Sequence, residues 1–245
     1  MVIKKMYEIL EFGEVKRKAD VRRAKDMEEV IIDKEWLKRN RETELYYMYR
    51  DLWKKGDKET IERNNLRYDI TIIPDEKMGE EYVKTKGHYH PEASEGVTYP
   101  ELYAVLEGKA HYILQKVVKG KLEDVVLIRA ETGEKALIPP GYGHITINTG
   151  DKPLKMANWV DSTFDSIYGD MLNLEGGAYY ELTTGEFIEN ENYESVPELR
   201  EAEPTVISDL GIEKDKDMYS LIDNPENLKF LSEPQSYKSV FEDII

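Results

Sequence analysis

The chain has 245 residues, of which 40% are hydrophobic, so it is long enough to fold around a core of its own. It contains no cysteine, which excludes disulfides and thiolate ligands and leaves nitrogen and oxygen as the donors for any metal. The formal charge is −16, and residues 170–245 hold most of the excess, with 19 Asp and Glu against 5 Lys and Arg. Such an acidic chain repels phosphate backbones, so we expect no nucleic-acid partner.

The sequence also lacks the features of a membrane protein. No segment has the length of apolar residues that a membrane span requires, and the N-terminal stretch has no apolar core of a signal peptide. We therefore expect a cytoplasmic protein with no membrane partner. The acidic balance still permits a small phosphorylated ligand, because backbone N–H groups and hydroxyls can hold one locally.

The first 65 residues read as mainly helical or irregular, with short extended pieces. Between residues 25 and 53, large apolar side chains recur at roughly helical intervals, broken by polar runs: Val30, Ile31, Trp36, Leu37, Leu45 and Trp53. The pattern predicts an N-terminal segment, residues 1–65, that packs on the main domain or forms part of a dimer interface.

From Leu66 the sequence changes to short apolar runs rich in β-branched and aromatic residues, separated by Pro, Gly, Asp and Asn turns. Such runs are typical of an antiparallel sandwich or barrel, so we expect a mainly β domain over residues 66–190. Within it, residues 176–190 are expected to add a strand or hairpin. Residues 191–245 form an acidic C-terminal extension, whose prolines and aromatic residues favour a segment that wraps the domain or mediates contacts.

Three of the four histidines and one glutamate are spaced to meet inside such a domain. His88 and His90 are two residues apart, so on a strand their imidazoles point to one face. Glu101 opens the strand-like run ELYAVLEG, and His144 opens HITIN. A barrel closed around these strands directs all four side chains inward. His111 has no such pattern, and we interpret it as structural.

Three imidazoles and one carboxylate suit a borderline divalent ion, which includes Fe, Mn, Ni, Zn and Co. On an octahedral ion, four protein ligands leave two positions for water or substrate oxygens, as catalysis requires. The side chains alone leave the identity of the ion open.

The spacing of these residues resembles the two motifs of the cupin superfamily. The second motif is a Gly, five residues, Pro-x-Gly, two residues, His, three residues and Asn, and the chain matches its fixed positions with Gly133, Pro139, Gly141, His144 and Asn148. The first motif is matched by His88-x-His90 and by Glu101, with Gly108 after six residues. The resemblance implies a cupin β-barrel (a double-stranded β-helix or jelly roll) whose metal ligands are His88, His90, Glu101 and His144.

The first motif departs from the superfamily pattern in two places. Tyr82 stands where the leading Gly is expected, and the insertion PEASEGVTYP lengthens the gap between His90 and Glu101. Glu92 and Glu95 lie in this insertion as alternative carboxylates. The strand-like sequence that follows Glu101 favours it as the ligand.

A more specific resemblance covers residues 45–190 and is densest over 84–153. The stretches TKGHYH, PELYAVLEGKAHYILQ and IPPGYGHITINTGDKP are similar to the cupin-type glucose-6-phosphate isomerases of archaea and some bacteria. The resemblance implies a metal-dependent enzyme of glycolysis and gluconeogenesis that interconverts glucose 6-phosphate and fructose 6-phosphate, with Fe(II) favoured among the ions. It also implies a cytoplasmic homodimer in which the partner covers exposed sheet edges.

In that family the phosphate site uses a strand threonine and the Thr and Gly of TKGH, which here are Thr71, Thr85 and Gly87. Two hydroxyls and a close glycine backbone can hold a phosphate without adding a cation. Thr71 fits equally well as an ordinary β-branched strand residue. Tyr103 matches an active-site tyrosine of the family, and Tyr168 matches a later one that lines the pocket.

For an isomerisation, the sequence leaves two routes open. One removes the C2 proton through an enediol or enediolate, with Glu101 as the first candidate base, and the other shifts a hydride directly between C1 and C2. The family's histidine before the Tyr-Gly pair is missing, and Asp165 or Ser166 occupies that neighbourhood. A metal-dependent sugar-phosphate binding protein without turnover, or an isomerase or epimerase for another phosphosugar, therefore remains an alternative. A cupin dioxygenase fits less well, because it leaves Thr71 and TKGH without a role.

Overall fold

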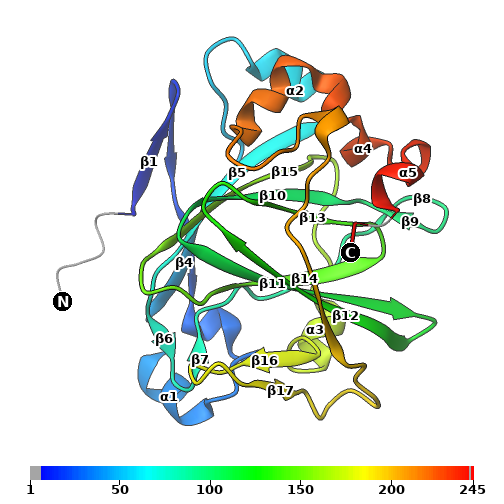
Figure 1. The fold of residues 1–245 in the computed structure, drawn as a ribbon. Coiled ribbons are helices and arrows are strands. Elements are labelled where there is room, and N and C mark those ends of the chain that lie inside the picture. Colours follow the sequence, from blue (N-terminus) through cyan, green and yellow to red (C-terminus); the bar gives the residue numbers. More distant parts are fainter. Residues whose placement is uncertain (1–6, 243) are drawn as a thin grey trace.

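In the computed structural model, which describes residues 7–242 and 244–245, two β-sheets face each other as a jelly-roll sandwich (Figure 1). The larger sheet has the antiparallel order β13 (Lys135–Ile138), β10 (Glu101–Glu107), β15 (Leu154–Asp161), β5 (Leu66–Ile73), β4 (Glu44–Tyr49) and β3 (Asp20–Arg23). The smaller sheet has the order β14 (Tyr142–Asn148), β11 (Lys109–Val118), β12 (Lys121–Glu131) and β18 (Leu199–Ala202). The mainly β fold of the cupin kind is confirmed, and within the described residues its two sheets are not joined into one closed ladder.

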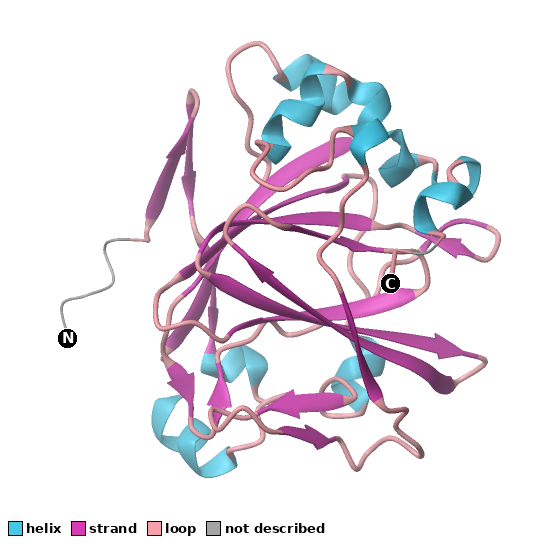
Figure 2. Ribbon diagram, in the orientation of Figure 1, coloured by secondary structure: helices cyan, strands magenta, loops and turns pink. Residues whose placement is uncertain are grey.

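Shorter elements surround these sheets. Four hairpins pair β1 (Ile9–Phe12) with β2 (Val15–Lys18), β6 (Lys77–Met78) with β7 (Glu81–Tyr82), β8 (Glu92–Ser94) with β9 (Val97–Thr98), and β16 (Tyr179–Glu181) with β17 (Phe187–Glu189). The α-helices are α1 (Lys34–Asn40), α2 (Lys58–Arg63), α3 (Gly169–Asn173), α4 (Lys229–Ser232) and α5 (Lys238–Phe241). The 3-10 helices are η1 (Ala24–Met27), η2 (Ser208–Leu210), η3 (Met218–Asp223), η4 (Pro225–Leu228) and η5 (Pro234–Ser236). Figure 2 shows the helices gathered at the two ends of the sandwich. None of the helices in the described part of the chain is long and apolar enough to cross a membrane.

The N-terminal segment is only partly as predicted. Helix α1 lies within the region of helical spacing, but residues 44–49 form strand β4, which pairs with β5. The helical interpretation of these residues was wrong because β4 is buried on both faces, which hides the alternation of a strand: Tyr47 and Tyr49 pack in one core cluster and Tyr46 in another. The larger sheet thus continues across residue 65, and the division into residues 1–65, 66–190 and 191–245 stays a prediction. The hairpin expected within 176–190 is confirmed as β16–β17.

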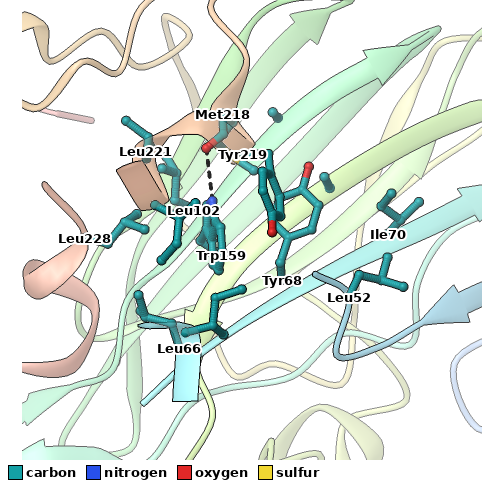
Figure 3. Close-up of a cluster of buried hydrophobic side chains, with 14 of the residues drawn as sticks. Leu52, Leu66, Tyr68, Ile70, Leu102, Trp159, Met218, Tyr219, Leu221 and Leu228 are labelled. Atoms are coloured by element: carbon teal, nitrogen blue, oxygen red, sulfur yellow. Dashed lines mark hydrogen bonds between the residues drawn. The ribbon is translucent and has the colours of Figure 1, made fainter. Parts of the chain in front are cut away.

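The C-terminal extension packs against the outer face of the larger sheet. Figure 3 shows Tyr219, Met218, Leu221 and Leu228 of this extension around Trp159 of β15. The Trp159 indole N–H donates to the carbonyl of Met218 at 3.0 Å, and the side chain is fully buried. Because a buried indole N–H needs an acceptor, the extension completes the core at this point.

Candidate active site

Backbone pairing between the TKGH segment (residues 85–88) and strand β14 brings His88 and His144 together. The His88 N–H donates to the carbonyl of His144 at 3.3 Å, and the His144 N–H donates to the carbonyl of His88 at 3.0 Å. The Thr85 N–H donates to the carbonyl of Thr146 at 2.8 Å in the same way. The segment therefore extends the smaller sheet beyond β14, and the two imidazole centroids lie 4.4 Å apart.

Glu101 reaches the same point from the larger sheet, as the first residue of β10. Its Oε2 lies 3.3 Å from Nε2 of His90 and 3.4 Å from Nε2 of His144. One donor atom from each of His88, His90, Glu101 and His144 lies within 4.8 Å of the others, and the four could hold a metal ion. The fold thus brings together the four side chains that the sequence pattern singled out, which we call the His-Glu cluster.

The donor atoms of the cluster point toward one another, and several of them offer lone pairs. Glu101 Oε2 is buried and has no hydrogen-bond partner among the described residues, and Nε2 of His88 lies 3.1 Å from Nε2 of His90. His90 Nδ1 lies 2.9 Å from the carbonyl oxygen of Tyr99, so Nδ1 carries the proton and Nε2 is a lone-pair donor. Buried lone pairs in contact repel unless a cation lies between them. The donor set therefore suits one divalent metal ion.

The insertion between His90 and Glu101 supplies the Tyr99 carbonyl. It folds as the hairpin β8–β9, which contacts η5 of the C-terminal extension, and then passes the cluster at Tyr99. The Tyr99 ring stacks on Phe164 at 4.6 Å, and Phe164 lies 4.7 Å from the ring of His90. The insertion thus orients a ligand candidate and covers it with aromatic surface.

The other acidic and imidazole candidates lie outside the cluster. Glu92 and Glu95 are exposed on the β8–β9 hairpin and do not join the four residues. His111 on β11 has its Nδ1 2.8 Å from Oε1 of Glu181. This contact agrees with the interpretation of His111 as a structural residue.

Burial keeps the imidazoles of the cluster neutral. Burial first, and then the neighbouring imidazoles, hold the pKa of His144 well below its ordinary value of 6.5. The pKa of His88 is lowered well below the same value, by burial and then by His90. Neutral imidazoles are the form that binds metal.

Because these pKa values are lower in the folded chain than in the unfolded chain, we expect the metal-free protein to lose stability as pH falls below 6.5. Above that pH both states hold the imidazoles neutral; below it the unfolded chain binds protons that the folded chain rejects, at about 1 kcal/mol per pH unit for each histidine. Urea denaturation of the chelated protein at pH 7.5, 6.5 and 5.5 measures this slope. Equal stability at the three values would contradict the buried neutral pair.

A cavity adjoins the cluster and is lined by every residue that the sequence analysis proposed for substrate binding. Its walls include Thr71, Thr85, Gly87, Tyr103 and Tyr168, together with His88, His90 and Glu101. His144 lies behind these walls and is 1% exposed. Of the tyrosines on β4, Tyr46 lines the cavity, and its hydroxyl accepts the Lys86 N–H at 3.2 Å.

Thr85 and Gly87 have the properties of an anion cradle. The Thr85 hydroxyl oxygen accepts the N–H of Thr146 at 2.9 Å, which leaves the hydroxyl hydrogen free to donate into the cavity. Gly87 has a φ of +78°, and a Cβ there would lie 2.6 Å from Sδ of Met171 and 2.7 Å from Cγ1 of Ile145. Any larger residue is therefore excluded both by conformation and by space.

The two tyrosines contact the cluster directly. The Tyr103 hydroxyl lies 3.1 Å from Nε2 of His144, and burial, followed by the charge of Glu101, raises its pKa well above its ordinary value. Tyr103 therefore keeps its proton and acts as a donor. The Tyr168 ring, immediately before α3, lies 5.5 Å from the ring of His88.

The family model of glucose-6-phosphate isomerase (GPI) matches residues 21–198, well over half of the chain. This chain belongs to the cupin-type glucose-6-phosphate isomerase family. Curated relatives named glucose-6-phosphate isomerase include those of Thermococcus litoralis (35% identical over 139 residues), Pyrococcus abyssi (32% over 136) and Pyrococcus furiosus (32% over 136). The matches cover 54–56% of this chain and 65–66% of those relatives, just under two thirds of their length. Among solved structures, oxalate decarboxylase of Bacillus subtilis is a distant likeness (TM-score 0.37, 16% identity, 56% of this chain and 31% of that one).

Within this glucose-6-phosphate isomerase fold, the cavity wall at the missing family histidine is polar and small. Ser166 lines the cavity and is half-buried, whereas Asp165 is exposed and does not line it. Of the two residues left open by the sequence, Ser166 is therefore the one that faces the site.

Sequence reasoning missed a group of polar residues in the same cavity. Arg67, Asp69 and Asn158 line it from strands β5 and β15, and Arg50 lines it just beyond the end of β4. The available signal was the alternation Arg-x-Asp-x-Thr in LRYDITII, which places two charges on the face that also carries Thr71. Charged residues are almost never fully buried unless they are paired, so Arg and Asp on an otherwise apolar strand mark a polar region inside the fold.

Proposed function

We propose that this chain is a metal-dependent aldose–ketose isomerase that interconverts glucose 6-phosphate and fructose 6-phosphate. The observation that carries the proposal is one cavity lined both by His88, His90 and Glu101 of the His-Glu cluster and by the Thr85–Gly87 cradle. A phosphosugar needs a phosphate site and a site for its carbonyl end, and the cavity offers one of each. Membership of the glucose-6-phosphate isomerase family supports this choice of substrate.

In this proposal His88, His90, Glu101 and His144 hold one divalent metal ion. Family resemblance favours Fe(II), and Mn, Zn, Ni or Co suit the same donors. When bound, the ion supplies positive charge beside the sugar oxygens and polarises the carbonyl.

The chain's own groups bind and orient the substrate. The hydroxyls of Thr71 and Thr85 and the backbone at Gly87 hold the phosphate as hydrogen-bond donors. Tyr168 closes the wall beside His88. Tyr103, which keeps its proton, donates to a sugar oxygen near the carbonyl end.

Glu101 is the first candidate for the proton transfer. Starting from glucose 6-phosphate, the Glu101 carboxylate takes the proton from C2, the C–H electron pair forms the C1=C2 double bond, and the carbonyl oxygen O1 takes the charge. The hydroxyl proton on O2 then moves to O1, the C2–O2 bond becomes the new carbonyl, and Glu101 returns its proton to C1. The rival route shifts a hydride between C1 and C2 and needs no base.

Incubation of the purified protein with fructose 6-phosphate tests the function, with any glucose 6-phosphate oxidised by a coupled dehydrogenase. We expect turnover that chelation removes and that one or more of Fe(II), Mn, Zn, Ni and Co restores. In heavy water, proton transfer introduces deuterium at the migrating position, whereas a hydride shift leaves it unlabelled. Absence of turnover with all of these metals would rule out the isomerase.

Ser166 lines the cavity where the family has a histidine, and this difference favours testing two alternatives to the glucose-6-phosphate isomerase. A metal-dependent protein that binds a phosphosugar without converting it, or that acts on a different phosphosugar, would use the same cradle. A thermal-shift screen of phosphosugars next to the coupled assay separates these outcomes, because a binder is stabilised by ligands that it does not turn over.

The cytoplasmic homodimer that the resemblance implies stays a prediction. Strand β3 is an edge of the larger sheet and is the part of the N-terminal segment that a partner would cover. Sedimentation of the purified protein gives the oligomeric state directly.

A further inference from the structure

Arg67 presents most of its guanidinium to the cavity without a protein partner. Its Nε donates to both carboxylate oxygens of Asp69, at 3.1 and 2.9 Å, and the side chain is 29% exposed. Among the described residues, no acceptor takes a hydrogen bond from its two terminal nitrogens. Asp69 is 5% exposed and also accepts the N–H of Asp51 at 2.8 Å, so the carboxylate that orients the guanidinium is itself fixed.

Asn158 adds a second polar group without a partner on the same wall. It lies between Asp69 and Tyr103 in the strand register, is 5% exposed and lines the cavity. No hydrogen bond of its side-chain amide is found within the described residues. Buried polar groups are nearly always hydrogen-bonded, so the buried Asn158 amide beside the Arg67 guanidinium indicates a ligand with polar atoms in this cavity.

The strand register places Arg67 at the metal end of the cavity. Val160 pairs with Glu101 on one side and with Arg67 on the other, so Glu101 and Arg67 stand in one row across three strands, about 10 Å apart at the backbone. Thr71 lies four residues further along β5, about 13 Å from Arg67. The guanidinium therefore serves the end of a bound molecule that is remote from the Thr71 hydroxyl.

A purely structural role, in which Arg67 neutralises the buried Asp69, accounts for the Nε contacts alone. That role does not account for the four N–H groups on the two terminal nitrogens of Arg67, which lines the cavity. The guanidinium fork can donate two parallel hydrogen bonds to the two oxygens of a carboxylate or of an enediolate. Neutral hydroxyl oxygens are weaker acceptors for the same donors.

We propose that Arg67, positioned by Asp69 and assisted by Asn158, is an oxyanion subsite for the carbonyl end of the phosphosugar. This inference rests on the proposed function for its substrate, and it names a specificity-determining residue for that site. The subsite favours ligands that carry negative charge at C1 and C2 over ligands that carry neutral hydroxyls there.

Binding of two matched probes to the metal-loaded protein tests the proposal by calorimetry. Arabinonate 5-phosphate carries a carboxylate at the end remote from phosphate, and arabinitol 5-phosphate carries a neutral alcohol. Arg67→Lys keeps the charge beside Asp69 but loses the fork, and the double variant Arg67→Met, Asp69→Asn removes both charges while the amide still accepts the Asp51 N–H. Arg23→Met is the matched control, since Arg23 pairs with Glu44 outside the cavity.

We expect the aldonate to bind about 10-fold more weakly to the lysine variant and about 100-fold more weakly to the double variant. The affinity for arabinitol 5-phosphate should change by less than about 3-fold in either variant, and the Arg23→Met control should bind both probes as the wild type does. Equal losses for both probes, or no loss, would overturn the subsite; if the double variant fails to fold, the lysine variant decides. Turnover of the wild type is measured separately. Selective binding of the aldonate by a wild type that shows no turnover would contradict the proposed isomerase activity but still support the oxyanion subsite.

Discussion

Replacement of Glu101 by glutamine is expected to lower turnover of fructose 6-phosphate by about 100-fold to 10,000-fold, the range that a general base contributes. The amide cannot take the proton from C1 of fructose 6-phosphate, and it is a poorer metal ligand than the carboxylate. The three imidazoles remain, so part of the metal binding should survive. The coupled assay gives the rate, and metal analysis of the same sample gives the occupancy.

Glu92→Gln is the control for this experiment, because Glu92 carries the same charge on the exposed β8–β9 hairpin and lies outside the cluster. Its turnover should equal that of the wild type. A Glu101→Gln enzyme with full metal and full activity would exclude Glu101 as the base. A slow variant with full metal, whose product in heavy water carries no deuterium, would instead support the hydride shift.

Replacement of Trp159 by alanine is expected to lower the free energy of unfolding by about 3–5 kcal/mol, as for other large buried aromatic residues. The indole lies against Tyr68 at 4.8 Å and Tyr219 at 5.6 Å, and its N–H is bound to the Met218 carbonyl (Figure 3). Alanine removes the two ring contacts and the hydrogen bond, and it leaves a cavity between β15 and the C-terminal extension. Urea denaturation at pH 7.5 measures the change from the midpoint and slope.

Trp159→Phe separates the hydrogen bond from the packing. It keeps an aromatic ring and loses the N–H, so we expect a smaller loss of about 1–2 kcal/mol. Limited proteolysis of the alanine variant should cut the extension first, since η3 is the element that Trp159 holds. An alanine variant as stable as the wild type would show that the extension does not complete this core.

The ligand set was accessible from sequence because period-two spacing and fixed loop lengths specify which side chains share a face. His88 and His90 are two residues apart, so an extended segment points both to one face, and the interval from Gly133 to Asn148 fixes where His144 enters the fold. Glu101 was identified despite the ten-residue insertion, because it begins β10 and its neighbours alternate as a strand.

Strand β4, the role of Tyr99 and the cavity residues Arg67 and Asn158 were harder to predict, for different reasons. The burial of β4 on both faces removed its alternation, so local spacing resembled a helix. The role of Tyr99 depends on a backbone carbonyl, which every residue has, so no residue type marks it. Arg67 and Asn158 meet the cluster only because β15 runs between β5 and β10.

The sequence by itself predicted the mainly β fold and the four donor residues from residue type and short-range spacing, and the family resemblance added the Thr85–Gly87 cradle. The tertiary structure decided which sheet each donor comes from, that Ser166 rather than Asp165 faces the cavity, and that Arg67 shares a row with Glu101. Strand order and register join residues far apart in sequence. They are set by the burial of whole sheets against each other, so no local pattern records them.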